Sequence, residues 1–114
     1  GLTMMTFKSV VQKLTTTAAT LYTTPNDTSS IIFSGVISNT SSTKEAVTVS
    51  LYLTNGSTNV YLLAETEIQY GSSVTLPKIL IKPGYSIVGI AVGDASNNAV
   101  DITLSILEVT STDA

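Results

Sequence analysis

The clearest pattern in the sequence is an alternation of apolar and polar residues on both sides of an Asn-Gly pair. Before the pair, every second residue is apolar: Val47, Val49, Leu51 and Leu53. Asn55-Gly56 is a preferred pair for a two-residue type I′ hairpin turn, because both central positions take a positive φ. This turn predicts a hairpin in which Thr54 faces Ser57 and Val47 faces Ala64. On the outward face, Tyr52 and Tyr61 become near diagonal neighbours.

Shorter segments of the same strand-like composition fill the rest of the chain. They read "FKSVVQKL", "ATLYTT", "SIIFSGVIS", "SVTLPKILI", "SIVGIAV" and "AVDITLSI". Turn-forming residues separate them, including Pro25-Asn26-Asp27. Pro83-Gly84 is another, and its residues are those that a type II turn prefers. Strands separated by turn signals about every 8–12 residues are typical of antiparallel sandwiches and jelly rolls. We therefore expect an all-β, antiparallel β-sandwich or jelly-roll-like fold of about seven or eight short strands.

The residue pattern also predicts local features of these strands. Pro77 predicts an edge position or a break between two short strands, since proline cannot donate to a ladder. Gly35 marks a bulge or a close approach, on one face with Ile31, Phe33 and Ile37. The near-continuous apolar run "SIVGIAV" predicts a strand buried on both faces. Near the end of the chain the inward residues are Val100, Ile102, Leu104 and Ile106, and a change of phase predicts a bulge near Glu108.

A chain of 114 residues is long enough for one core and too short for two, so residues 1–114 form a single domain. The first seven residues are apolar for a chain start. They are read as the beginning of the first strand, or as an N-terminal arm that docks on a neighbouring subunit. Gly1 to Thr3, which precede two methionines, can also be a tag remnant. Residues 110–114 are expected to be frayed.

Charge is scarce along the whole chain. Only 11% of residues are charged, the net charge is −3, and the lysines are scattered rather than clustered. Nucleic-acid binding requires a basic surface, so no nucleic-acid partner is expected. No apolar run approaches the ~20 residues of a membrane-spanning helix, so no membrane partner is expected either.

Most catalytic chemistry lacks its residues here. The chain has no histidine and no cysteine, which excludes a Ser-His-Asp arrangement, a reactive thiolate and the usual zinc ligands. Glu65 and Glu67 share a face if the strand is extended, and paired carboxylates can cleave glycans. The favoured reading is two solvated glutamates. The loop Asp94–Asn98 lacks the glycine and bidentate glutamate of a calcium loop, and we expect a polar hairpin loop without metal or cofactor.

Five residues are candidates for partner contacts. Tyr52 and Tyr61 present aromatic faces that suit sugar stacking, although outward tyrosines also stabilise cross-strand packing or lie beneath a partner. Met4, Met5 and Phe7 make the chain start apolar and are candidates for contact with a neighbouring subunit.

Several segments together resemble small β-sandwich structural proteins of tailed-bacteriophage virions. They are "TLYTTPNDTSSIIFSGVISNTSS", "AVTVSLYL", "YLLAETEIQYGSSVTLP" and "IKPGYSIVGIAV", which span about Thr20 to Val109. The matching positions are Leu21, Tyr22, Pro25, Asn39-Thr40-Ser41, Val47 to Leu51, Pro83-Gly84 and Ser86-Ile87. The sequence departs at "PNDTSS", where relatives tend to carry Gly and Lys. The motifs lie in turns and strand faces, and they carry over no catalytic residue.

The resemblance implies a role in a virion. We expect a non-enzymatic structural protein, most of all a capsid decoration or cement protein that stabilises the shell by contacts between subunits. Its partners would be the major capsid protein or tail and neck proteins, and it would form a homo-oligomer, with a trimer favoured. The alternatives are a neck, tail or fibre component, and a receptor- or glycan-binding β-sandwich module. The hydroxyl-rich, weakly charged surface fits an assembly part, because few charges lose water when it is covered.

Overall fold

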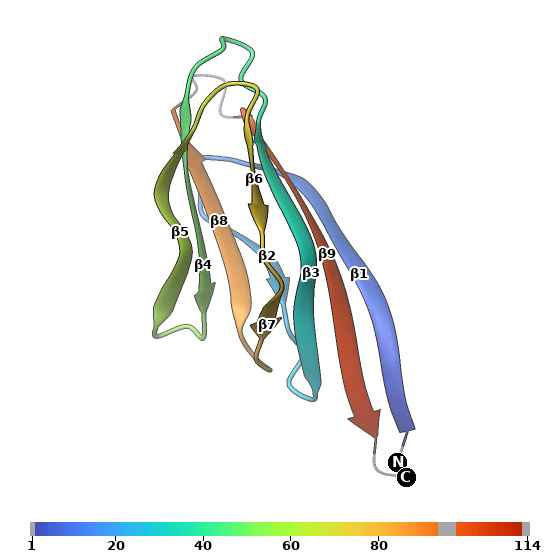
Figure 1. The fold of residues 1–114 in the computed structure, drawn as a ribbon. Coiled ribbons are helices and arrows are strands. Elements are labelled where there is room, and N and C mark those ends of the chain that lie inside the picture. The colour runs from blue at the N-terminus through green and yellow to red at the C-terminus, as the bar shows by residue number, and fades with distance from the viewer. Residues whose placement is uncertain (1, 94–97, 113–114) are drawn as a thin grey trace.

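The computed structural model describes residues 2–93 and 98–112, which form nine strands in two antiparallel sheets. The strands are β1 (Leu2–Leu14), β2 (Ala19–Thr23), β3 (Thr28–Asn39), β4 (Val47–Thr54), β5 (Asn59–Ile68), β6 (Ser73–Leu76), β7 (Ile79–Ile81), β8 (Ser86–Val92) and β9 (Val100–Thr112). The larger sheet has the order β1-β9-β3-β6, with β7 also paired to β3. The smaller sheet has the order β2-β8-β4-β5. Figure 1 shows the two layers and the long ribbon of β1 and β9.

The chain crosses repeatedly between the two sheets, as in a jelly roll. The predicted antiparallel β-sandwich is confirmed. The structure has nine strands rather than seven or eight because Pro77 divides one strand into β6 and β7, which pair successively with β3 at the edge of the larger sheet. Both alternatives predicted from Pro77, the break and the edge position, therefore occur together.

The core lies between the sheets and is almost entirely aliphatic. The four β9 residues predicted to point inward, Val100, Ile102, Leu104 and Ile106, are all buried. Gly89 of β8 lies at a close approach between the sheets, because a Cβ there would stand 2.8 Å from Leu14 Cδ2. Gly35 is also a close-approach site, since a Cβ would meet Leu104 and Leu76 at 3.0 Å.

The hairpin of β4 and β5 forms, but its predicted register was wrong. Thr54 faces Asn59 instead of Ser57, and Val47 faces Ile68 instead of Ala64. Asn55 does not have the positive φ that a type I′ turn requires. Its Oδ1 instead accepts hydrogen bonds from the backbone N–H groups of Ser57 (3.0 Å) and Thr58 (2.8 Å), which organises a four-residue turn. Two register shifts along β5 displace the pairing further.

A second correction concerns the phase of β3. The pairing with β9 shifts between Ile32 and Ser34, so Phe33 is a bulged residue. The inward side of β3 therefore carries Ile32 and Gly35, while Ile31 and Phe33 do not share the face of Ile37. The bulge predicted near Glu108 is absent, because β9 pairs with β1 without interruption. The irregularity lies in the neighbouring strand, where no proline or charge marks it.

The last residues of the chain also differ from expectation within the described part. Thr110 to Thr112 belong to β9 and pair with Met4 to Leu2, so these residues are not frayed. Residues 113 and 114 lie outside the described residues. The turn at Pro83-Gly84 is confirmed, with a Gly84 φ of 79° and a 3.1 Å hydrogen bond from the Tyr85 N–H to the Lys82 carbonyl.

Candidate interaction surfaces

The outer face of the larger sheet exposes an unusual amount of apolar surface. Because Leu104 and Ile106 of β9 point into the core, Leu107 and Val109 point away from it. In register with them on β1 are Phe7 and Met5, which are 70% and 68% exposed. The bulge in β3 turns Phe33 onto the same face, where its ring centroid lies 6.2 Å from that of Phe7. This patch, consisting of Met5, Phe7, Phe33, Leu107 and Val109, is called the outer patch below.

Around the outer patch, most of the outward positions of β1, β9 and β3 carry no charged side chain. The outward residues between Thr3 and Val11 of β1, between Thr103 and Ser111 of β9, and between Ser29 and Val36 of β3 are all apolar or hydroxyl-bearing. Charges appear only at the rim. Lys78 Nζ lies 5.6 Å from the Phe33 ring centroid, and Lys13 forms a 2.6 Å ion pair with Asp101 further along the sheet.

At the end that carries both termini, β1 and β9 extend past the smaller sheet (Figure 1). There β1 contributes Leu2–Phe7 and β9 contributes Leu107–Ser111, and Thr28–Ile31 of β3 pair with Leu107–Thr110 along the other side of β9. Met4 points to the opposite face from Met5 and Phe7, yet it is still 59% exposed because no strand of the smaller sheet covers it. The structure thus places the predicted contact residues Met4, Met5 and Phe7 within a strand, with apolar side chains on both faces.

The other two predicted contact residues lie on the smaller sheet. Tyr52 and Tyr61 are directly opposite each other across β4 and β5, rather than diagonal, and their ring centroids are 5.0 Å apart. The structure therefore brings these two rings together more closely than the predicted register did. It does not bring them near Met4, Met5 or Phe7, which belong to the other sheet.

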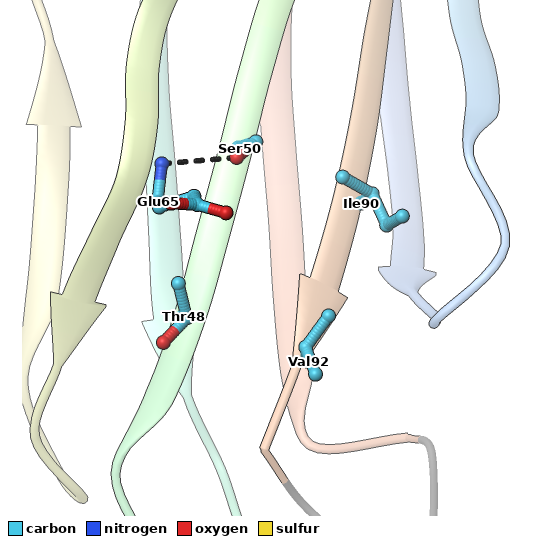
Figure 2. A pocket seen from close by; sticks show the side chains of 5 residues that line it. All are labelled: Thr48, Ser50, Glu65, Ile90 and Val92. Atoms are coloured by element: carbon cyan, nitrogen blue, oxygen red, sulfur yellow. Dashed lines mark hydrogen bonds between the residues drawn. The ribbon is translucent and has the colours of Figure 1, made fainter.

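Glu65 lines a shallow depression of about 530 Å³ on the outer face of the smaller sheet. Figure 2 shows Glu65 beside Ser50 and Thr48, with Ile90 and Val92 across from them. Glu65 has a φ of 46°, and its backbone N–H donates to Ser50 Oγ at 3.0 Å. Glu67 is not among the lining residues, and its Oε1 accepts a 2.6 Å hydrogen bond from Gln69. The two carboxylates do not flank one cavity, as a glycosidase pair would.

The described residues include neither a cluster of metal ligands nor a membrane-spanning helix. No group of three or more carboxylate, histidine or cysteine side chains is placed to hold a metal ion in the described ranges. Most of the candidate loop at Asp94–Asn98 lies outside them. The part of the chain that the structure describes also contains no helix long and apolar enough to cross a membrane.

A polar bridge between the sheets was not predicted from the sequence. Tyr22 of β2 donates its hydroxyl hydrogen to Glu108 of β9, and its oxygen lies 2.6 Å from Ser30 Oγ of β3. Burial and the hydrogen bond to Glu108 raise the pKa of the Tyr22 hydroxyl above its ordinary value of 10.0. The alternation of β9 places Glu108 at an inward position, which indicates a buried carboxylate that needs a partner. Nothing in the sequence identified that partner, which lies 86 residues away.

We expect Tyr22→Phe to change the stability of the protein at alkaline pH. The folded chain holds the Tyr22 proton more tightly than the unfolded chain does, so this stabilisation is complete below the unfolded pKa and is lost as pH rises through the folded pKa. The free energy of unfolding should fall above about pH 10, and less steeply in the variant. At neutral pH the lost hydrogen bonds should cost about 1–3 kcal/mol.

Urea unfolding followed between about pH 8 and pH 11 measures both effects. Tyr70→Phe, at an exposed tyrosine, is the control and should retain the wild-type decline. Equal slopes for wild type and Tyr22→Phe would show that the bridge does not hold the proton.

A second buried polar residue fixes the end of β3. Asn39 is 2% exposed, and its Nδ2 donates to the carbonyl oxygens of Glu45 (2.8 Å) and Ile68 (2.9 Å). Its Oδ1 accepts from the Ser41 N–H at 2.9 Å. Asn39 therefore joins three chain segments. Together with Tyr22 and Pro83-Gly84, it shows that residues carrying the resemblance to virion proteins hold the fold together.

The comparisons with known proteins give a fold but no family. No protein-family model matches the sequence, and no curated protein matches it. A solved structure of Bacillus endospore appendages, described as disulfide-linked pili, is 15% identical, with a TM-score of 0.55 over 96% of this chain and 89% of that one.

Two crystal structures of a pentameric capsid protein from metagenomic phage sequences are also similar. They are 17% and 18% identical over 86% and 87% of this chain, with TM-scores of 0.43 and 0.41. This chain spans 59% and 60% of their lengths. Those scores are too low to support an argument, whereas the likeness to the appendage protein shows a shared fold.

Proposed function

We propose that this protein is a non-enzymatic structural subunit of a tailed-bacteriophage virion, acting as a capsid decoration or cement protein. The observation that carries the proposal is the outer patch, an exposed apolar surface on the outer face of the larger sheet whose neighbouring outward residues on β1, β9 and β3 are apolar or hydroxyl-bearing. Exposed patches of this kind mark interaction sites in soluble proteins. The sequence resemblance to virion proteins supplies the class of assembly.

The chemistry of the surface supports a role in assembly. Covering the outer patch removes apolar area from water, which contributes about 25 cal/mol per Å². The charged group nearest to its aromatic rings is the Lys78 ammonium beside Phe33, so the patch itself contains no ion that must lose its water. The appendage protein with the same fold is described as forming pili through disulfide links, whereas these 114 residues contain no cysteine. Cohesion would therefore come from buried surface, with the major capsid protein or tail and neck proteins as partners and a homo-oligomer, a trimer, as the unit.

The sugar-binding alternative has one observation in its favour. Tyr52 and Tyr61 form a paired aromatic surface on the other sheet, and Tyr61 is half exposed. Such a surface suits a receptor- or glycan-binding module at the tip of a fibre. It is compatible with a virion location but places the protein away from the shell.

Immunogold electron microscopy with an antibody against the purified protein tests the proposal. The sample is phage particles purified from the source that encodes the chain, and the control is the same antibody saturated with the protein. Gold over the head shell is the expected result. Gold confined to the neck, tail or fibres would replace decoration with the alternative role, and unlabelled particles would overturn the virion role.

A further inference from the structure

We propose that the depression around Glu65 and the adjoining pair of tyrosines form one binding site for a neutral oligosaccharide. The site lies on the outer face of the smaller sheet, on the opposite side of the sandwich from the outer patch. A protein docked through its outer patch would therefore present this site to its surroundings. The inference goes beyond the proposed function and does not depend on the virion role.

Glu65 has a backbone conformation that residues other than glycine rarely adopt. Its φ of 46° occurs inside β5, where the register shifts beside Ser50 of β4, which faces both Ala64 and Glu65. Lys44, another described residue with a positive φ, lies in a loop instead. A glycine would take this φ without steric cost, and strained residues of this kind cluster at binding and active sites. The outlier therefore identifies Glu65 as a candidate for ligand contact.

The depression combines polar groups with an aliphatic wall. The Glu65 side chain extends from β5 toward β4 (Figure 2), and within the described ranges no side chain pairs with its carboxylate. Thr48 supplies a hydroxyl, and Ser50 Oγ accepts the Glu65 N–H, so the Ser50 hydroxyl hydrogen can be donated. Ile90 and Val92 of β8 lie across from these groups. The depression thus offers acceptors, donors and apolar surface to one ligand.

The tyrosine pair continues this surface along β4. Thr48, Ser50 and Tyr52 alternate with buried residues, so their side chains share the outward face. Successive residues on one face of a strand are about 6.6 Å apart, a spacing comparable to one sugar unit. Tyr61 lies opposite Tyr52, with ring centroids 5.0 Å apart. A chain of two or more sugar units can therefore contact the depression and the aromatic rings together.

A neutral oligosaccharide matches this combination of groups. Sugar rings carry hydroxyls at their edges and apolar C–H groups on their faces. The Glu65 carboxylate can accept from neighbouring sugar hydroxyls, while the C–H groups pack on the tyrosines and the aliphatic wall. An acidic sugar would bring a second negative charge beside Glu65, which disfavours it. The volume of about 530 Å³ lies within the range of about 300–1,000 Å³ for ligand sites, and its shallow form suits a chain lying across it.

NMR titration of the ¹⁵N-labelled protein tests the site. The probes are tetrasaccharides of glucose, galactose, mannose and N-acetylglucosamine, and tetragalacturonate is the acidic counterpart. At least one neutral probe should give saturable shifts confined to the amides around Ser50, Tyr52 and Glu65. Tetragalacturonate should give none. Absence of saturable shifts with all four neutral probes, or equal binding of the acidic probe, would overturn the inference.

Variants separate recognition from folding. Glu65→Gln should weaken binding about tenfold or more, because it removes hydrogen bonds to a charged acceptor. Tyr61→Ala should also weaken it, because the exposed aromatic face is lost. Glu67→Gln is the matched control, since Glu67 lies outside the depression and bonds to Gln69. Tyr70→Ala, at another exposed tyrosine, is the second control, and both should bind like the wild type.

Glu65→Gly excludes unfolding as the cause of any loss. Glycine suits the φ of this position, so the variant should melt at no lower temperature than the wild type while losing the sugar. Unchanged binding by Glu65→Gly or Glu65→Gln would overturn the site, as would binding of tetralysine in place of every sugar. Sugar binding with unlabelled virions would refute only the virion role, whereas labelled virions without sugar binding would refute only this site.

Discussion

Asn39→Asp is expected to lower the free energy of unfolding by about 3 kcal/mol or more, although the two side chains have nearly the same shape. The introduced carboxylate would place an oxygen where Nδ2 now donates to the carbonyl oxygens of Glu45 and Ile68. Two buried acceptors would lose their donor and would face a negative charge instead. Each buried group left unsatisfied costs about 1–3 kcal/mol, and more where a charge is involved.

Asn55→Asp is the matched control for this experiment. The Asn55 side chain is exposed, and its Oδ1 accepts hydrogen bonds from two backbone N–H groups, a role that a carboxylate oxygen fills equally well. The substitution removes only a long, exposed hydrogen bond of 3.4 Å from Nδ2 to the Tyr85 hydroxyl. Urea unfolding at pH 7 should show a change within about 0.5 kcal/mol for Asn55→Asp. Similar losses for the two variants would mean that the buried hydrogen bonds of Asn39 do not explain its effect.

Leu104→Ala should destabilise the protein by about 2–5 kcal/mol. Leu104 is 0% exposed, and its Cδ2 lies 3.0 Å from the position that a Cβ on Gly35 would take. The deletion leaves a cavity beside a residue that has no side chain to fill it, so we expect a value toward the upper part of that range.

Leu80→Ala, at an exposed leucine of β7, removes the same atoms from a surface position and should cost no more than about 0.5 kcal/mol. Thermal and urea unfolding of both variants provide the comparison. A loss for Leu104→Ala no larger than for Leu80→Ala would show that the core collapses around the deletion.

The fold was predictable because its main signals are local. Alternation placed Val100, Ile102, Leu104 and Ile106 inward, and Pro77 marked the break between β6 and β7. The register of β4 and β5 was not predictable from the Asn-Gly pair, because the Asn55 side chain stabilises a longer turn. The bulge at Phe33 was not predicted either. It depends on how β3 pairs with β9, and no short segment of sequence encodes that pairing.

The candidate surfaces were also predictable only in part. The apolar character of Met4, Met5 and Phe7 was evident from the sequence, but their association with Phe33 depends on strand pairing and on the bulge. The Tyr22–Glu108 bridge joins residues distant in the chain, so the alternation of apolar and polar residues does not reveal it. What could be predicted was the kind of side chain; what required the structure was which strands bring such side chains together.

The pairing of the first strand with the last has a consequence for synthesis on the ribosome. Leu2 pairs with Thr112, and β9 also pairs with β3 along nearly its whole length. The larger sheet therefore lacks β9, the strand between β1 and β3, until translation reaches residue 112. Until then β1, which carries Met4, Met5 and Phe7, has no partner strand. Long-range pairing of this kind makes folding slow and exposes strands to aggregation. Met5 and Phe7 of the outer patch thus lie on the strand that remains without its partner for longest in the nascent chain.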